Sequence, residues 1–250
     1  MGLCKFCRED RPFIRAHIIP AAFHRDLQGG SDRPPIILGT SPQWFPKRNP
    51  GGLYDETMLC GSCEARFGPW DQYGAQCLLQ NFETDQRPIS PTDTSLGYQM
   101  VTWDERRLRM FAISLLWRAA VTTNEIFRRA KLGPHEGRVR ERIVQADPGD
   151  PADLAVFFCK WTASPGREPL TLTQISPYTY KLDGVNVTRF FLGGFVIYIK
   201  VDRRKLGSPL DGITLSPGRP VYAIARDLES SKEWTALRPG ISRFIEDQRR

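Results

Sequence analysis

The sequence has no long apolar run. None of its apolar stretches approaches the roughly 20 residues that a helix needs to span a bilayer, so no membrane partner is expected. A signal-peptide core is missing after Met1, and Phe6 stands where a myristoylation motif requires serine or threonine. Internal repeats and low-complexity tracts are also missing. These features lead us to expect a cytoplasmic protein without repeat architecture.

Acidic residues are outnumbered by basic ones. The chain carries 35 Lys and Arg against 28 Asp and Glu, a formal charge of +7. The excess lies beyond residue 100: residues 1–100 hold 10 basic and 11 acidic residues, whereas residues 101–250 hold 25 and 17. A basic protein is more often than average a partner of a polyanion. The charge therefore modestly favours a polyanion such as nucleic acid as partner, and a protein partner is a further expectation for the second region.

Four of the six cysteines fall into two Cys-x-x-Cys pairs. They are Cys4, Cys7, Cys60 and Cys63. A chain without an export signal is not expected to form disulfides, and four thiolates in two pairs suit a tetrahedral Zn²⁺. The alternatives are two unrelated pairs or redox dithiols, and the βαβ pattern typical of redox pairs is missing around both. The isolated Cys77 and Cys159 are interpreted as buried thiols.

The pattern predicts an α+β protein. A zinc module over 1–83 is followed by a linker over 84–97, and an α+β domain of unknown function fills 98–250. Within the module, the Gly- and Pro-rich segment 28–52 is predicted as a loop. A knuckle, short strands and a helix that carries the second cysteine pair form the layout of a treble clef.

Local sequence patterns predict helices along the chain and, from residue 154, an antiparallel sheet; apolar periodicity is clear only in the helix at 108–119. The helices are expected at 20–27, 60–67, from residue 70, at 108–119 continuing toward 129, and at 134–145. The strands are expected at 13–19, 154–161, 170–175, 187–192, 195–201 and 221–225. Gly68-Pro69 is predicted to interrupt the helix that begins at Cys60, and Gly193-Gly194 predicts a hairpin turn.

The cysteine pairs enclose a further motif, His17-Ile18-Ile19-Pro20, and the second pair follows Asp55. Together these elements resemble the HNH (His-Me finger, ββα-metal) endonucleases that have a four-cysteine zinc site. The resemblance covers about residues 1–75. It implies that zinc is structural, that a histidine activates the water that attacks a phosphodiester of DNA or RNA, and that Mg²⁺ or Mn²⁺ is the catalytic metal.

Carried over position by position, the resemblance makes His17 the general base and Asp55 the residue that orients its imidazole. The family's metal ligand that directly follows the fourth cysteine falls on Glu64. Its ligand before the histidine falls on Ala16, which cannot bind a metal.

Four nearby residues are further candidates. His24 and Asp71 are possible replacements for the missing metal ligand, and Arg15 and Arg25 are candidates for binding nucleic-acid phosphate. The plain structural alternatives are a solvent-facing His24 and ordinary surface arginines.

Two functions follow as expectations. The leading one is a metal-dependent HNH-like endonuclease acting on DNA, with RNA as the second substrate class and bacterial defence as a setting that the resemblance suggests. The alternative is a catalytically inactive treble-clef zinc module that binds nucleic acid or protein, and Ala16 is the observation that favours it.

Overall fold

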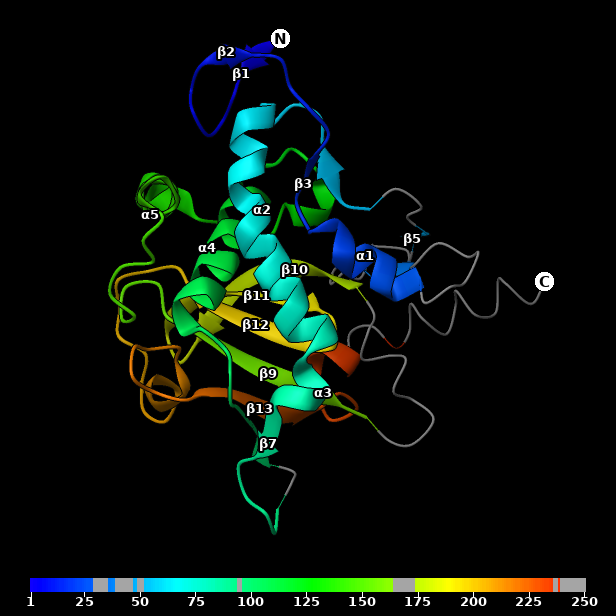
Figure 1. The fold of residues 1–250 in the computed structure, drawn as a ribbon, viewed down its shortest axis with the longest axis vertical. Coiled ribbons are helices and arrows are strands. Elements are labelled where there is room, and N and C mark those ends of the chain that lie inside the picture. Colours follow the sequence, from blue (N-terminus) through cyan, green and yellow to red (C-terminus); the bar gives the residue numbers. More distant parts are fainter. Residues whose placement is uncertain are drawn as a thin grey trace, which may run out of the picture.

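The computed structural model describes residues 1–28, 36–38, 47–48, 52–93, 96–163, 174–235 and 238. It confirms an α+β fold, with helices over one face of a large sheet and the N-terminal strands β1 and β2 at one end of the molecule (Figure 1). No helix among these residues combines the length and apolar character that a membrane span requires.

Short strands and one helix form the N-terminal part. Its elements are β1 (Gly2–Leu3), β2 (Asp10–Arg11), β3 (Ala16–His17), α1 (Ala21–Gln28) and β6 (Tyr54–Asp55). β1 pairs with β2, and β3 pairs with β6, both in antiparallel fashion. The turn after Cys4 requires a left-handed residue, and Arg8 takes that conformation with φ 64°.

Helix α2 (Gly61–Ala75) begins one residue after Cys60 and runs through Pro69 without a break. The predicted interruption at Gly68-Pro69 is therefore wrong. Pro69 removes one hydrogen bond, which costs roughly 3 kcal/mol inside a helix. Packing on both sides of it offsets this cost: Phe67 stacks on Trp117, and Asp71 forms an ion pair with Arg118. The helix continues as a π-helical turn (Gln76–Gln80) and α3 (Phe82–Asp85).

Helix α4 (Glu105–Val121) is buried along most of its length. Asp104 caps its first turn by accepting a hydrogen bond from the Arg107 N–H at 3.0 Å. Its predicted apolar stripe is confirmed, but Arg109 and Arg118 are buried with it. Short 3₁₀ turns at Glu125–Phe127 and Gly133–His135 follow, and then α5 (Glu136–Gln145). α4 packs between α2, α5 and the sheet (Figure 1).

Nine strands form the main sheet, in the order β5-β4-β10-β11-β12-β9-β13-β8-β7. Their bounds are β4 (Ile36–Leu38), β5 (Lys47–Arg48), β7 (Gln86–Pro88), β8 (Gly97–Met100), β9 (Val156–Thr162), β10 (Gln174–Leu182), β11 (Val185–Leu192), β12 (Phe195–Lys200) and β13 (Val221–Asp227). The sheet is mixed rather than antiparallel, because β4 runs parallel to β10 and β13 runs parallel to β9.

Four of these strands lie where sequence patterns predicted none. β4 and β5 fall in the predicted loop 28–52, β7 falls in the predicted linker 84–97, and β8 begins at the end of that linker. Residues 29–35, 39–46 and 49–51 of that loop lie outside the described part of the chain, and so do residues 170–173 of the strand predicted at 170–175. The hairpin at Gly193-Gly194 is confirmed, and both glycines have positive φ (58° and 75°).

A single buried cluster joins the N-terminal part to the helices and to one face of the sheet. It extends from Cys4 through Phe67 and Trp117 to Ala223. Polar contacts add to it: Lys5 Nζ donates to the Val121 carbonyl at 2.6 Å, and Arg140 Nε donates to the Phe6 carbonyl at 2.6 Å. The cysteine-bearing segment is thus fixed to α4 and α5.

Candidate functional site

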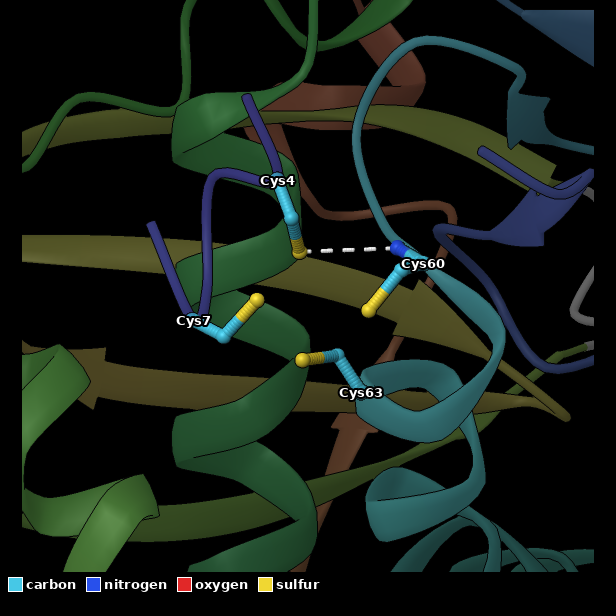
Figure 2. A group of neighbouring side chains, drawn as sticks. All are labelled: Cys4, Cys7, Cys60 and Cys63. Carbon is cyan, nitrogen blue, oxygen red and sulfur yellow. Dashed lines mark hydrogen bonds between the residues drawn. The ribbon is translucent and has the colours of Figure 1, made fainter. Parts of the chain in front are cut away.

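The four paired cysteines converge at one point. Cys4 and Cys7 come from the N-terminal turn, and Cys60 and Cys63 from the start of α2, with all four sulfurs directed toward one another (Figure 2). Their Sγ atoms lie within 4.8 Å of one another. Zinc–sulfur bonds of about 2.3 Å place tetrahedral ligands about 3.8 Å apart, so the cluster fits a structural metal ion such as Zn²⁺.

The electrostatics of these thiols also favour a cation. Burial raises the pKa of Cys63, and hydrogen bonds with the neighbouring thiols raise it further. Burial acts in the same direction on Cys60, but hydrogen bonds from Ser62 and the Cys63 N–H outweigh it and lower the pKa of Cys60 to about 6. The Cys60 N–H also donates to Cys4 Sγ at 3.4 Å. A divalent cation stabilises such neighbouring groups together as thiolates.

The cysteine cluster leads directly into a second set of polar residues around His17. Its main chain is held from both sides: its N–H donates to Glu64 Oε1 at 3.0 Å, and its carbonyl accepts from Arg118 Nη1 at 2.9 Å. Glu64 follows Cys63 in the first turn of α2. The metal cluster and the position of His17 are therefore coupled through one helical turn.

The His17 imidazole is half-buried and makes no hydrogen bond within the described residues. Burial lowers the pKa of His17 below its ordinary value, and the positive charges of Arg15 and Arg118 lower it further. The neutral imidazole, which can accept a proton, therefore predominates at neutral pH.

Arg118 lies completely buried beneath His17 and pairs with Asp71. Its Nη1 and Nη2 atoms donate to Asp71 Oδ2 at 2.8 Å and to Oδ1 at 2.5 Å. Nη2 also contacts Ser114 Oγ at 3.4 Å. Such a two-point contact fixes the plane of the guanidinium relative to the plane of the carboxylate. Both oxygens of Asp71 are thus engaged by Arg118, so the structure uses this residue to hold the arginine that supports His17.

Glu64 keeps one carboxylate oxygen without a partner. Its Oε2 is buried and has no hydrogen bond among the described residues. Burial raises the pKa of Glu64, while the charge of Arg118 and the N–H of His17 oppose this effect. A buried oxygen of this kind seeks a cation or a donor, so it is the atom best suited to bind a ligand here.

These residues line one open cleft of about 420 Å³. The predicted residues that it brings together are His17, Glu64, Asp71 and Arg25. The exposed Arg25 comes from α1 and faces the helix α2 wall. An accessible imidazole, an orphaned carboxylate oxygen and a guanidinium in one cleft can bind an anion and move a proton.

No protein-family model, curated protein or solved structure matches this chain. Its function must therefore be argued from the geometry of the cleft and of the cysteine cluster.

The structure does not bring Asp55 to His17. β3 and β6 pair Ala16 with Asp55 and His17 with Tyr54, and neighbouring residues of a strand point to opposite faces. The Asp55 carboxylate instead accepts hydrogen bonds from Thr57, Thr122 and Thr123. The expected orienting role is corrected to a structural one: Asp55 joins β6 to the end of α4.

Replacing Asp55 is expected to lower stability in a pH-dependent way. Burial disfavours its ionisation, but hydrogen bonds from Thr122, Thr123 and Thr57 outweigh burial and hold the pKa of Asp55 well below its ordinary value. A depressed pKa stabilises the fold above the unfolded-state value of about 3.9, and this contribution disappears as the pH falls further. Asp55→Asn should cost about 1–3 kcal/mol at pH 7.

Urea denaturation of wild type and Asp55→Asn between pH 3 and pH 7 tests this expectation. The gap between the two free energies of unfolding should narrow below about pH 4. A gap that stays constant over this range would contradict it. Asp93→Asn, which changes an exposed aspartate, serves as the control.

His24 and Arg15 lie near the cleft but are not among the residues that line it. His24 is buried at 7% exposure, contrary to the solvent-facing alternative, and its ring lies 3.6 Å from the position of a Cβ on Gly52. The Arg15 guanidinium lies over the Tyr54 ring at 3.5 Å. Among the described residues, the four cysteines are the only group of three or more metal-binding side chains whose ligand atoms lie close together.

Sequence reasoning missed Arg118 and the glutamines of the cleft wall, Gln72, Gln76 and Gln80. The sequence does hold one indication of its role: Arg118 is the only charged residue in the otherwise mostly apolar stretch from Ile113 to Ala120. A fully buried arginine requires a paired acid, and Asp71 is that partner.

Proposed function

We propose that the protein is a metal-dependent endonuclease that hydrolyses phosphodiester bonds of nucleic acid, with DNA as the preferred substrate. The supporting observation is the shared cleft, in which an accessible His17 with a lowered pKa lies beside the unpaired Glu64 oxygen and the exposed Arg25. The adjoining cysteine cluster, as the structural zinc site, would hold the start of α2 and hence Glu64.

In this mechanism Arg25, His17 and Arg118 each have one task, and Glu64 has one for each carboxylate oxygen. Arg25 binds a phosphate oxygen, and the His17 imidazole takes a proton from a water molecule as that water attacks phosphorus. The bond from phosphorus to the leaving oxygen breaks and that oxygen takes up a proton from solvent, while Arg118 and Glu64 hold the His17 main chain. Glu64 Oε2 is the oxygen that would bind Mg²⁺ or Mn²⁺, which supplies charge stabilisation of the phosphate when bound.

Changing His17 to alanine tests the proposal. Loss of a general base should slow cleavage of plasmid and oligonucleotide DNA in Mg²⁺ or Mn²⁺ by about 10²- to 10⁴-fold. Zinc content should not change, because His17 is not one of the clustered ligands. His135→Ala, which changes a half-buried histidine outside the cleft, is the matched control and should cleave like wild type.

Two results would overturn the proposal. Equal cleavage by His17→Ala and wild type would show that His17 is not the base. Failure of wild type to cleave DNA and RNA with either metal would favour the second candidate, a zinc module that binds nucleic acid or protein. That candidate is supported by Ala16 and by the engagement of both Asp71 oxygens with Arg118.

A further inference from the structure

Three glutamines at four-residue intervals line the wall of the cleft that α2 and the following π-helical turn provide. They are Gln72, Gln76 and Gln80. Gln72 and Gln80 are exposed and Gln76 is half-buried. Within the described part of the chain none of their side-chain amides makes a hydrogen bond, so each presents a free donor and a free acceptor to the cleft.

The π-helical turn is what keeps these glutamines in line. In an α-helix, a step of four residues overshoots one turn by about 40°, so two such steps would rotate Gln80 by about 80° from Gln72. A π-helical turn is wider, and the same step falls short of a full turn. The second step therefore offsets the first, and Gln80 stays on the cleft face.

The α1 side of the cleft is largely apolar. Pro20, Ala21 and Ala22 line it there, whereas Ala75 lies among the glutamines on α2. The α1-side residues Pro20, Ala21 and Ala22 have no polar side-chain atoms. The neutral polar side chains of the cleft are thus concentrated in the glutamine row, with the carboxylates of Glu64 and Asp71 on the same helix and Arg25 and His17 on other elements.

We propose that Gln72, Gln76 and Gln80 form a base-reading row that contacts adenine edges next to the scissile phosphate. This inference rests on the proposed nuclease function and deepens it. A glutamine amide can donate to adenine N7 and accept from adenine N6–H at the same time. The row spans about 12 Å, the length of three to four stacked bases at about 3.4 Å each.

The chemistry of the row favours base contacts over phosphate contacts. Its amides carry no charge, so they add little to attraction for the backbone, which arginine and lysine provide. Arg25 is the charged group placed to hold a phosphate. Arg25 would therefore position the nucleic-acid backbone, and the glutamine row would select the base.

Cleavage of a pool of randomised DNA duplexes, followed by sequencing of the ends, tests this inference. Wild type should cut preferentially beside adenines. Gln76→Ala and Gln80→Ala should each lose adenine preference at one position, with cleavage of an adenine-containing site falling about 5- to 100-fold. Gln145→Ala on α5, an exposed glutamine outside the cleft, should behave as wild type.

Binding measured in the His17→Ala background separates this inference from the proposed reaction. Fluorescence anisotropy with adenine-containing and adenine-free duplexes should show a preference that Gln76→Ala removes. Cleavage that depends on His17 but shows no glutamine-dependent preference would overturn the row and leave the nuclease proposal standing. A glutamine-dependent preference in binding without any cleavage by wild type would support the row and overturn catalysis. Neither preference nor cleavage would overturn both.

Discussion

Cys60→Ser is expected to release zinc and to unfold the N-terminal part of the protein. Structural zinc sites contribute apparent binding free energies of about 10–16 kcal/mol in small metal-binding peptides, whereas whole domains are stable by about 5–15 kcal/mol. Cys60 belongs to α2's end of the cluster and Cys4 to the N-terminal turn. Loss of the Cys60 thiolate should therefore remove the metal that links the N-terminal turn to α2, and a strong chelator should produce the same result in wild type.

Zinc content by elemental analysis and thermal unfolding measure this effect. Wild type should contain about one zinc atom per chain, and Cys60→Ser should contain far less and melt at a much lower temperature. Cys77→Ala is the matched control, because Cys77 is buried but lies outside the cluster. A Cys60→Ser protein that keeps its zinc and its melting temperature would refute the metal centre.

Arg118→Met should be the most damaging single change at the base of the cleft. It would leave the Asp71 carboxylate buried without its partner, and breaking a buried ion pair in this way costs about 3–5 kcal/mol. The His17 carbonyl would also lose its donor, so cleavage should fall even at temperatures where the variant is folded. Burial raises the pKa of Asp71, and the charge of Arg118 opposes that effect.

Urea denaturation of Arg118→Met beside Arg106→Met checks this expectation. Arg106 lies on the same helix, but its contact with Asp147 at 3.1 Å is exposed, so its loss should cost at most about 1 kcal/mol. Adding Asp71→Asn to Arg118→Met should recover part of the stability, because the unpaired charge disappears. Equal losses of unfolding free energy in the two arginine variants would show that the buried Arg118–Asp71 pair adds no more stability than an exposed contact.

Sequence patterns over short stretches correctly predicted individual helices, a hairpin and the meeting of the cysteine pairs. The paired cysteines meet as their spacing predicted, and the start of α2, the apolar stripe of α4 and the β11–β12 hairpin follow from periodicity and turn residues. The mixed sheet could not be predicted in this way. Which strands lie side by side depends on pairings across the whole chain, such as β4 with β10.

The candidate site shows the same division. The resemblance described above implied that His17 and Glu64 are close, and the His17 N–H donates a hydrogen bond to Glu64 Oε1. The face on which Asp55 lies depends on the register of β3 against β6, which a pair of two-residue strands does not reveal. Arg118 is 101 positions from His17, so only the folded chain shows that it belongs to the site.

The long distance in sequence between His17 and the residues that support it has a consequence during protein synthesis. The first segment of the site is complete early, yet Arg118 supports His17 from 101 positions downstream, and Arg140 holds the Phe6 carbonyl from 134 positions downstream. A nascent chain that has not yet exposed α4 and α5 outside the ribosome cannot assemble the cleft, whatever its zinc content. Chain elongation itself would therefore delay completion of the site around His17 until α4 and α5 have been made.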